Sequence, residues 1–491
     1  MIRDFHHFFA EVCCMENKLS LYILTDTHYL SRKMWEECEH INNREKGDQI
    51  AIKSTPQILR SFFKKIVEDK DTPYVLITGD LINNGDKISH QDFINELKML
   101  TDAGKTVFVT AATHDYAGLG DDENIFSPVY YKKDGCERAE RVYKTELPGI
   151  YFDFGHKYAD SIDEESGSYS VSFPGGFRLI AIYDNGNGRS HCGLFDKGFL
   201  WLENEIDKAK AKGEWVFLAV HHPVIPPWPI YKDIAEFEMF GGYKRLREIM
   251  CEKGVRVIFT GHTHVHGIKK YEDSEGRFFY DITTSALPSA EGRMRKVVFD
   301  KEDGSCKVES IAIEKIDGFD TGGLSAREYI YSLNFIGLIE KSFPLIDTDW
   351  DKFTENVSRV ANIPFLKKHP LISKAGIKLF LNLKMSLPAR LGKKAGGITK
   401  DEIKRLKGVF LSDAVINIVS RVFSGNGPYP PETAEYKALT GSVIKAERLL
   451  KIFGFDINKL IPGEETVLET LKHFLYNDRT GDDEKITFMM E

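Results

Sequence analysis

Six near-continuous apolar runs, most of which end in polar or acidic residues, constrain the fold of this chain more than any other feature. The runs are LSLYILTD (19–26), YVLITGD (74–80), TVFVTAA (106–112), FRLIAIYD (177–184), WVFLAVH (215–221) and VRVIFTGH (255–262). Strands that helices cover on both faces have this composition. Segments with helical spacing separate them, at 55–69, 90–104, 195–212 and 240–252. The alternation predicts an α/β architecture with crossover connections.

The chain changes character near residue 320. Between 262 and 315 the pattern is of strands alone, in FFYDITTS, RKVVFD and CKVESIAIE, which predicts that they complete a sheet. Beyond it the pattern is helical, and residues 321–491 hold 25 Lys and Arg against 21 Asp and Glu, whereas the first 320 residues are acidic. We therefore expect an N-terminal tail (1–17), an α/β domain (18–319) and a helical C-terminal region of five or six helices (320–491).

Hydropathy and cysteine usage narrow the setting. No run of 18 apolar residues is present, which predicts that no helix spans a membrane. The seven cysteines are scattered without a CxxC pair, which favours a reducing, cytoplasmic location. Residues 361–410 hold 12 Lys and Arg against two Asp and Glu. A solvated helical face is the favoured explanation of this run, and an anionic membrane or nucleic acid is the alternative.

Imidazoles and carboxylates follow five of the apolar runs directly. They are Asp26 and His28, Asp80, His114, His221 and His222, and His262 and His264. Ligand sites in α/β proteins lie outside the carboxyl ends of the strands. Each residue alone has an ordinary explanation, such as a turn cap for Asp80 or a buried core histidine for His221. Five such strand ends together indicate one polar site.

The residue types predict a metal site. Alternate residues at an extended strand end point the same way, so that Asp26 and His28 are expected to reach one ion. Mixed imidazole and carboxylate ligands suit Zn, Fe or Mn rather than Ca. Two ions about 3.5–4 Å apart can clamp an in-line attack on phosphorus. A carboxylate between the ions would bridge them, and Asp80 is the residue expected there.

These motifs, in this order over residues 18–315, resemble those of the calcineurin-like metallophosphoesterase family. The resemblance implies an α/β fold built as a β-sandwich of two mixed sheets flanked by helices. It implies that one metal is held by Asp26, His28, Asp80 and His264, and the other by Asp80, Thr113, His221 and His262. It further implies that His114 steadies the transition state or protonates the leaving oxygen. The expected cofactors are two divalent or trivalent transition-metal ions, Mn, Fe or Zn.

Thr113 departs from the family pattern, which has asparagine at this position. A threonine hydroxyl is shorter and a weaker ligand than an amide oxygen. Three outcomes are open: Thr113 or a water that it holds completes the site, a neighbour replaces it, or the second ion binds poorly. Asp115, Asn83 and Asn84 are the candidate replacements. Because the other motif residues are intact, an active enzyme is favoured.

Contacts with the substrate are expected from residues beside the motifs. The candidates are Asn83, Asp115, Arg189, His191 and His222. The expected function is hydrolysis of a phosphomonoester or phosphodiester by metal-bound hydroxide at a dinuclear site, with a phosphate ester as the partner. One alternative is a cyclic-nucleotide or phospholipid diesterase. The other is a protein that binds phosphate without turnover because its second metal site is weakened.

Overall fold

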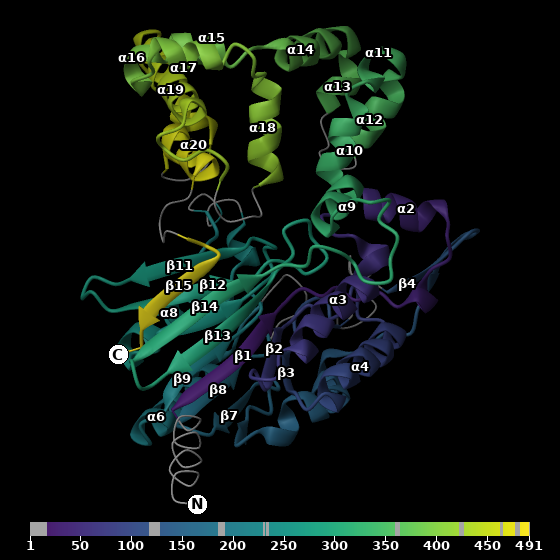
Figure 1. Cartoon of the computed structure of the whole chain (residues 1–491), viewed down its shortest axis with the longest axis vertical. Helices are drawn as coiled ribbons and strands as arrows, with labels where there is room; N and C mark the ends of the chain where they lie inside the picture. The colour runs from purple at the N-terminus through teal and green to yellow at the C-terminus, as the bar shows by residue number, and fades with distance from the viewer. Residues whose placement is uncertain are drawn as a thin grey trace, which may run out of the picture.

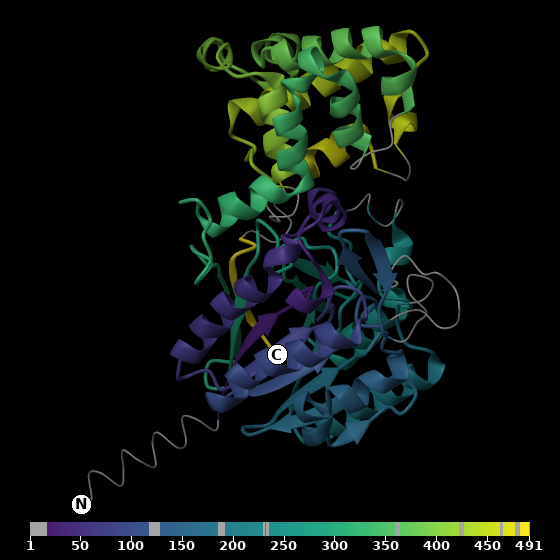
Figure 2. The same ribbon diagram turned by 90° about the vertical axis from the view of Figure 1, so that its right-hand side faces the viewer.

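The chain forms two lobes, a β-sandwich with its covering helices and a helical lobe at one end of it (Figures 1 and 2). The computed structural model describes residues 17–116, 128–184, 192–228, 231, 235–358, 364–421, 427–461, 465–476 and 482–490. Arg189 and His191 lie outside these ranges.

The first sheet has six strands in the order β15-β14-β13-β1-β2-β3. Its parallel part consists of β1 (Lys18–Leu24), β2 (Tyr74–Thr78) and β3 (Thr106–Thr110). Its antiparallel part consists of β13 (Met294–Asp300), β14 (Ser305–Ile311) and β15 (Lys485–Met489). The sheet is therefore mixed, and the three N-terminal strands point their carboxyl ends to one edge.

The second sheet has seven strands in the order β11-β12-β10-β9-β8-β7-β6. Its parallel strands are β8 (Phe177–Ala181), β9 (Trp215–Ala219), β10 (Val257–Thr260) and β12 (Phe278–Thr283). Its antiparallel strands are β6 (Ser161–Ile162), β7 (Tyr169–Phe173) and β11 (Gly267–Glu272). A separate hairpin joins β4 (Val129–Lys132) to β5 (Gly135–Arg138).

Helices cover the outer faces of both sheets. In the first half of the chain α3 (Thr55–Glu68) and α4 (Lys87–Asp102) pack against the first sheet, and α6 (Asp196–Ala211) and α8 (Tyr243–Lys253) against the second. The helix α2 (Glu39–Lys46) packs in a separate cluster, and the short α5 (Leu147–Ile150) adds Leu147 to the main core. One apolar cluster fills the space between the sheets and extends under α3 and α4, and a second lies between β8–β10 and the helices α6 and α8. The expected sandwich of two mixed sheets flanked by helices is confirmed. Three of the six apolar runs lie in each sheet. Each run is buried on both of its faces, because one face of the sheet packs on the other sheet and the opposite face is covered by helices.

Phe217 of β9 packs between the two sheets and is fully buried. Its ring stacks on Phe299 of β13, with ring centroids 4.9 Å apart. Phe217→Ala is expected to lower the free energy of unfolding by about 3–5 kcal/mol, because the lost contacts leave a cavity that the rigid sheets cannot close. Urea unfolding would measure the change. Phe152→Ala is the control, since Phe152 is 52% exposed; an equal loss in both variants would contradict the prediction.

The described part of the C-terminal region contains more helices than the five or six expected from the sequence. They are α9 (Ala326–Leu333), α10 (Phe335–Ser342), α11 (Leu345–Thr348), α12 (Trp350–Ser358), α13 (Pro364–Lys368), α14 (Pro370–Asn382), α15 (Ser386–Leu391), α16 (Lys393–Gly396), α17 (Lys400–Arg405), α18 (Leu411–Ser420), α19 (Ala434–Ile452) and α20 (Val467–Leu475). Caps divide the longer apolar patterns. Asn334, for example, ends α9 and accepts a hydrogen bond from Gly337 N at the start of α10.

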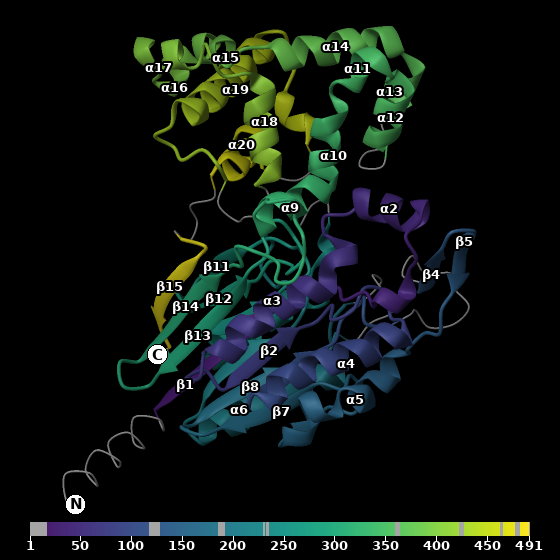
Figure 3. The same cartoon turned by 45° about the vertical axis from the view of Figure 1, so that its right-hand side comes forward.

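The helical region also differs from the expectation at both of its ends. Ala326 and Ile330 of α9 are buried in the core of the sandwich. Residues 485–489, expected within a helical region, form β15, which pairs with β14 at the edge of the first sheet (Figure 3). Phe488 of β15 contacts the ring of Tyr280 in β12 at a centroid distance of 4.5 Å. The chain thus leaves the sandwich after α9 and returns to it at its C-terminal strand.

The described residues bear on the expectations about membrane-spanning helices and about cysteines. None of the helices in these ranges has the length and apolar character needed to cross a bilayer. The five described cysteines, Cys38, Cys136, Cys192, Cys251 and Cys306, are free thiols.

Candidate metal centre

The motif residues are held by unusual backbone conformations. Five non-glycine residues of the described chain have positive φ, and all are candidate ligands: Asp26, His28, Asp80, His262 and His264, with φ between 41° and 69°. Left-handed conformations of this kind cost about 1–3 kcal/mol each and are concentrated at functional sites. Asp26 and His28 were expected to point the same way as alternate residues of an extended strand end. This expectation is wrong, because β1 ends at Leu24 and both residues have left-handed backbone conformations in the segment that follows it.

Two motif glycines make room for the candidate ligands. A Cβ atom at Gly79 would lie 2.8 Å from Cβ of His221. A Cβ atom at Gly261 would lie 2.4 Å from Oδ2 of Asp26. No side chain fits at these distances, and so the residues that precede Asp80 and His262 must be glycine for the ligands to approach one another.

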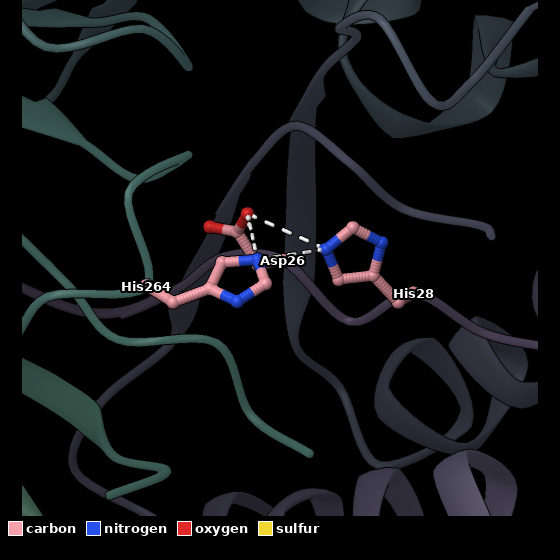
Figure 4. Close-up of side chains that lie close together, drawn as sticks. All are labelled: Asp26, His28 and His264. Carbon is pink, nitrogen blue, oxygen red and sulfur yellow. Dashed lines mark hydrogen bonds and ion pairs between the residues drawn. The ribbon is translucent and has the colours of Figure 1, made fainter. Parts of the chain in front are cut away.

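The side chains of Asp26, His28 and His264 point toward one another, as Figure 4 shows. Oδ1 of Asp26 is buried and has no hydrogen-bond donor. It lies 3.4 Å from Nε2 of His264, 3.6 Å from Nε2 of His28 and 3.6 Å from Nε2 of His221. A buried carboxylate oxygen without a donor is costly unless a cation satisfies it. The arrangement therefore fits a metal ion.

Asp80 lies between this group and a second one. Its Oδ2 is 2.9 Å from Nε2 of His221 and 4.0 Å from Nε2 of His28, and its Oδ1 accepts a hydrogen bond from the backbone N–H of His114. Ligand atoms lie within 4.8 Å of one another in three overlapping groups: Asp26, His28 and His264; His28, Asp80 and His114; and Asp80, His221 and His262. Asp80 is common to two of these groups, as is His28, and Asp80 stays the residue predicted to bridge the two ions.

Hydrogen bonds to backbone carbonyls orient two of the imidazoles. Nδ1–H of His221 donates to the carbonyl of Thr78 over 2.8 Å, which leaves Nε2 facing the carboxylates. Nδ1–H of His114 donates to the carbonyl of Asn83, which leaves Nε2 as the nitrogen available to the cleft. Such bonds select the tautomer of a metal-ligating or catalytic histidine.

Burial and mutual charge shift the pKa values in opposite directions. Burial alone would raise the pKa of Asp26, but His221, His264 and His28 hold it well below its usual range. Burial would lower the pKa of His221, but Asp80 and Asp26 raise it to about 9. The pKa of His114 is lowered to about 4, chiefly by burial, so that this imidazole is neutral at pH 7. The Asp26 carboxylate is therefore ionised, as metal ligation requires, whereas His221 would have to release its proton to ligate an ion.

The structure does not place every predicted residue in the cleft. Thr113 is buried and is not part of the cleft lining. Both oxygens of Asp115 accept backbone N–H groups, from Leu81, Ile82 and Ala112, so that it holds two loops together. His222 is fully buried and pairs with Asp184.

Asn83 is the predicted substrate contact that does line the cleft. Its side-chain amide is buried, with neither Oδ1 nor Nδ2 hydrogen-bonded. Such a group is costly to leave without partners, and it is therefore well placed to bind a ligand. Oδ1 of Asn84 is also buried without a partner, but Asn84 does not line the cleft.

Sequence reasoning missed several residues of the cleft, which has a volume of about 460 Å³. Oε2 of Glu238 lies 2.9 Å from Nε2 of His262. Arg44 in the last turn of α2 and Asp48 just beyond this helix also line the cleft, and they form an ion pair. None of these three residues belongs to a recognisable motif. Trp228, by contrast, belongs to the Pro- and aromatic-rich stretch HPVIPPWPIY (222–231), which the sequence predicts at the rim of the cleft. It lines the cleft and contacts Phe474 of α20, which brings the helical lobe to its margin.

Known proteins resemble this chain in sequence and in structure. Residues 19–266, half of the chain, match the family model for calcineurin-like phosphoesterases. The chain is 24% identical over 191 residues to the probable glycerophosphodiester phosphodiesterase GpdQ of Arcobacter nitrofigilis, and the match covers 39% of this chain and 56% of that protein. The structure is similar to a dimetal phosphatase from Danio rerio (TM-score 0.42, 12% identity, 60% of this chain and 95% of that one). It is also similar to purple acid phosphatase PPD1 from yellow lupin (TM-score 0.42, 12% identity, 62% and 53%).

Proposed function

From the premise that the chain belongs to the calcineurin-like phosphoesterase family, we propose that it hydrolyses phosphodiesters at a dinuclear metal centre. The observation that carries the proposal is Oδ1 of Asp26, a buried carboxylate oxygen without a donor that faces three imidazole nitrogens. The relative from Arcobacter nitrofigilis is a probable glycerophosphodiester phosphodiesterase, which favours a diester over a monoester as the first substrate class to test.

The proposal divides the ligands between two ions. Asp26, His28 and His264 would hold the first ion, His221 and His262 would hold the second, and both would share Asp80. When bound, such ions polarise the phosphoryl group and supply a nucleophile at neutral pH. His114 exchanges a proton with the substrate at Nε2, since Nδ1–H is committed to Asn83. The amide of Asn83 and the guanidinium of Arg44 bind the ester oxygens from the cleft wall.

Metal analysis and turnover together test this function. We expect close to two ions per chain after purification without chelator and loading with Mn, Fe or Zn. We also expect hydrolysis of bis(p-nitrophenyl) phosphate and of glycerophosphodiesters at a higher kcat/KM than that of p-nitrophenyl phosphate. A monoester preference would overturn the diester proposal. Two bound ions without turnover of either class would instead favour a protein that binds phosphate without hydrolysis.

We propose that Glu238 compensates for the missing asparagine at position 113. Its carboxylate touches His262 and lines the cleft, with 13% of the side chain exposed. Carboxylates complete transition-metal sites either as ligands or by orienting a ligating histidine, and loss of the second role alone weakens metal affinity about 10–100-fold.

Glu238→Gln is therefore expected to weaken binding of the second ion at least about 10-fold, measured by calorimetric titration and elemental analysis. Adding Thr113→Asn to this variant should restore the second ion. Glu236→Gln is the matched control, because Glu236 lies on the same short turn but bonds to Tyr243, outside the cleft. Unchanged metal affinity in Glu238→Gln would contradict the proposal.

A further inference from the structure

Helix α14 (Pro370–Asn382) presents apolar side chains on two opposite faces. Ile377 and Leu381 lie on its inner face and pack against the cluster that includes Ile346, Phe353 and Val357. On the outer face Leu371 is 82% exposed, Ile372 64% and Leu379 68%. A surface helix of a globular protein is ordinarily polar on the face turned away from the core. The outer face of α14 is therefore built to be covered.

The neighbouring helix α15 (Ser386–Leu391) extends this face. Its inner residues Pro388 and Ala389 are buried against the helical lobe, whereas Leu387 is 43% and Leu391 50% exposed. Helices α14 to α17 lie along one end of the molecule, the end farthest from the β-sandwich, in the views of Figures 1 and 3. The partners of α14 and α15, among them α12, α18 and α19, lie on the sandwich side of this row (Figure 1). The exposed Leu371, Ile372 and Leu379 of α14 are on the face opposite the packed Ile377 and Leu381.

The same segment is strongly basic. Residues 364–400 contain nine Lys and Arg and no Asp or Glu. Some of these cations interact within the lobe: Lys378 pairs with Asp347, Lys374 lies over the ring of Trp350, and Lys384 lies over the ring of Phe410. The exposed cations of this segment for which no ion pair is found in the described residues are Lys367, Lys368, Arg390, Lys393, Lys394 and Lys400. Unpaired cations thus flank the exposed leucines.

Charge decides which occupant this face fits. A second copy of the chain would bring an identical row of cations against it, and the repulsion would oppose association. A single acidic patch on a protein partner would pair with the cations but would leave the leucines and isoleucine in water. Apolar side chains interleaved with Lys and Arg on a helix that is too short to span a bilayer are typical of proteins that lie on an anionic membrane surface.

We propose that α14 and α15 dock the protein onto the surface of an anionic lipid bilayer. Leu371, Ile372 and Leu379 enter the boundary between headgroups and acyl chains, while the lysines and Arg390 bind the headgroup phosphates and carboxylates. The helices lie in the plane of the interface, and the β-sandwich projects away from it. The proposal does not depend on the metal chemistry, since none of these residues lines the cleft.

Vesicle binding of the full chain tests the proposal. Co-sedimentation with phosphatidylcholine vesicles, with and without phosphatidylserine, is expected to show binding that requires phosphatidylserine. The binding should weaken as salt is raised toward about 1 M, because the screening length falls from about 10 Å to about 3 Å. Leu371→Glu combined with Leu379→Glu, and separately Lys367→Gln with Lys368→Gln, Lys393→Gln and Lys394→Gln, should each lower the partition coefficient at least about 10-fold.

Lys197→Gln combined with Leu200→Glu is the matched control. Both residues are exposed on α6, at the opposite end of the molecule in Figure 1, and this variant should bind vesicles like the unchanged protein. Thermal unfolding and hydrolysis of a water-soluble ester by all variants verify that they are folded. Equal binding to neutral vesicles, absence of binding to either kind, or the same loss in the control would each overturn the proposal. So would a dimer in sedimentation that Leu379→Glu dissociates.

Discussion

Asp80→Asn is expected to remove at least one metal ion per chain and to lower kcat/KM for a diester by about 10³-fold or more, which corresponds to about 4 kcal/mol. Oδ2 of Asp80 lies 2.9 Å from Nε2 of His221, and Asp80 is shared by two of the three ligand groups. Loss of its charge therefore affects both ions. Asparagine is the appropriate replacement because it tolerates the left-handed backbone of this position, where φ is 47°.

Elemental analysis and steady-state kinetics on the same preparation measure both effects. Asp71→Asn removes the same charge from an exposed position just before β2 and serves as the control. If Asp80→Asn kept two ions per chain with unchanged affinity, the shared position proposed for Asp80 would be incorrect, even if turnover fell.

His114→Gln is expected to lower kcat about 10²–10⁴-fold, the usual contribution of a positioned proton donor or acceptor. Metal content should change little, because the other candidate ligands remain in place. His40→Gln, on the exposed side of α2, is the control. Loss of an ion together with activity would show that His114 is a ligand, a role that its position within 4.8 Å of His28 and Asp80 also permits.

The leaving group distinguishes the two catalytic roles of His114. A nitrophenolate leaves without protonation, whereas glycerol must receive a proton. If His114 protonates the leaving oxygen, His114→Gln should slow hydrolysis of a glycerophosphodiester much more than that of bis(p-nitrophenyl) phosphate. An equal loss with both substrates would show that the imidazole steadies the transition state instead. Burial lowers the pKa of His114 to about 4 and makes the neutral imidazole the dominant form at pH 7.

The order and type of the candidate ligands follow from the sequence alone. Apolar runs that end in Asp, His or Gly-Asp specify strands and the residues beyond them, because burial and strand geometry are local properties of the chain. The number of sheets did not follow from that pattern. Runs in one sheet and runs in two have the same composition when helices cover the outer faces, and only long-range strand pairing divides β1–β3 from β8–β10.

Tertiary structure decided how the ligands converge and what surrounds them. The left-handed turns at Asp26 and His28 are held by pairing with the loop after β2, where Asp26 N donates to the carbonyl of Gly79 and His28 N to that of Asp80. Local propensity disfavours such turns, so that no sequence rule predicts them.

Glu238 and the outer face of α14 are further features that only the folded chain reveals. Glu238 reaches His262 across 24 residues of chain, and a carboxylate in a loop has no periodicity that marks it. The basic run of residues 361–410 could be read from the sequence, but not which of its leucines stay exposed, because exposure depends on the helices that pack on the other side of α14. Local composition determined the elements and the chemistry of the side chains, whereas contacts between distant segments determined which of those side chains meet and which remain uncovered.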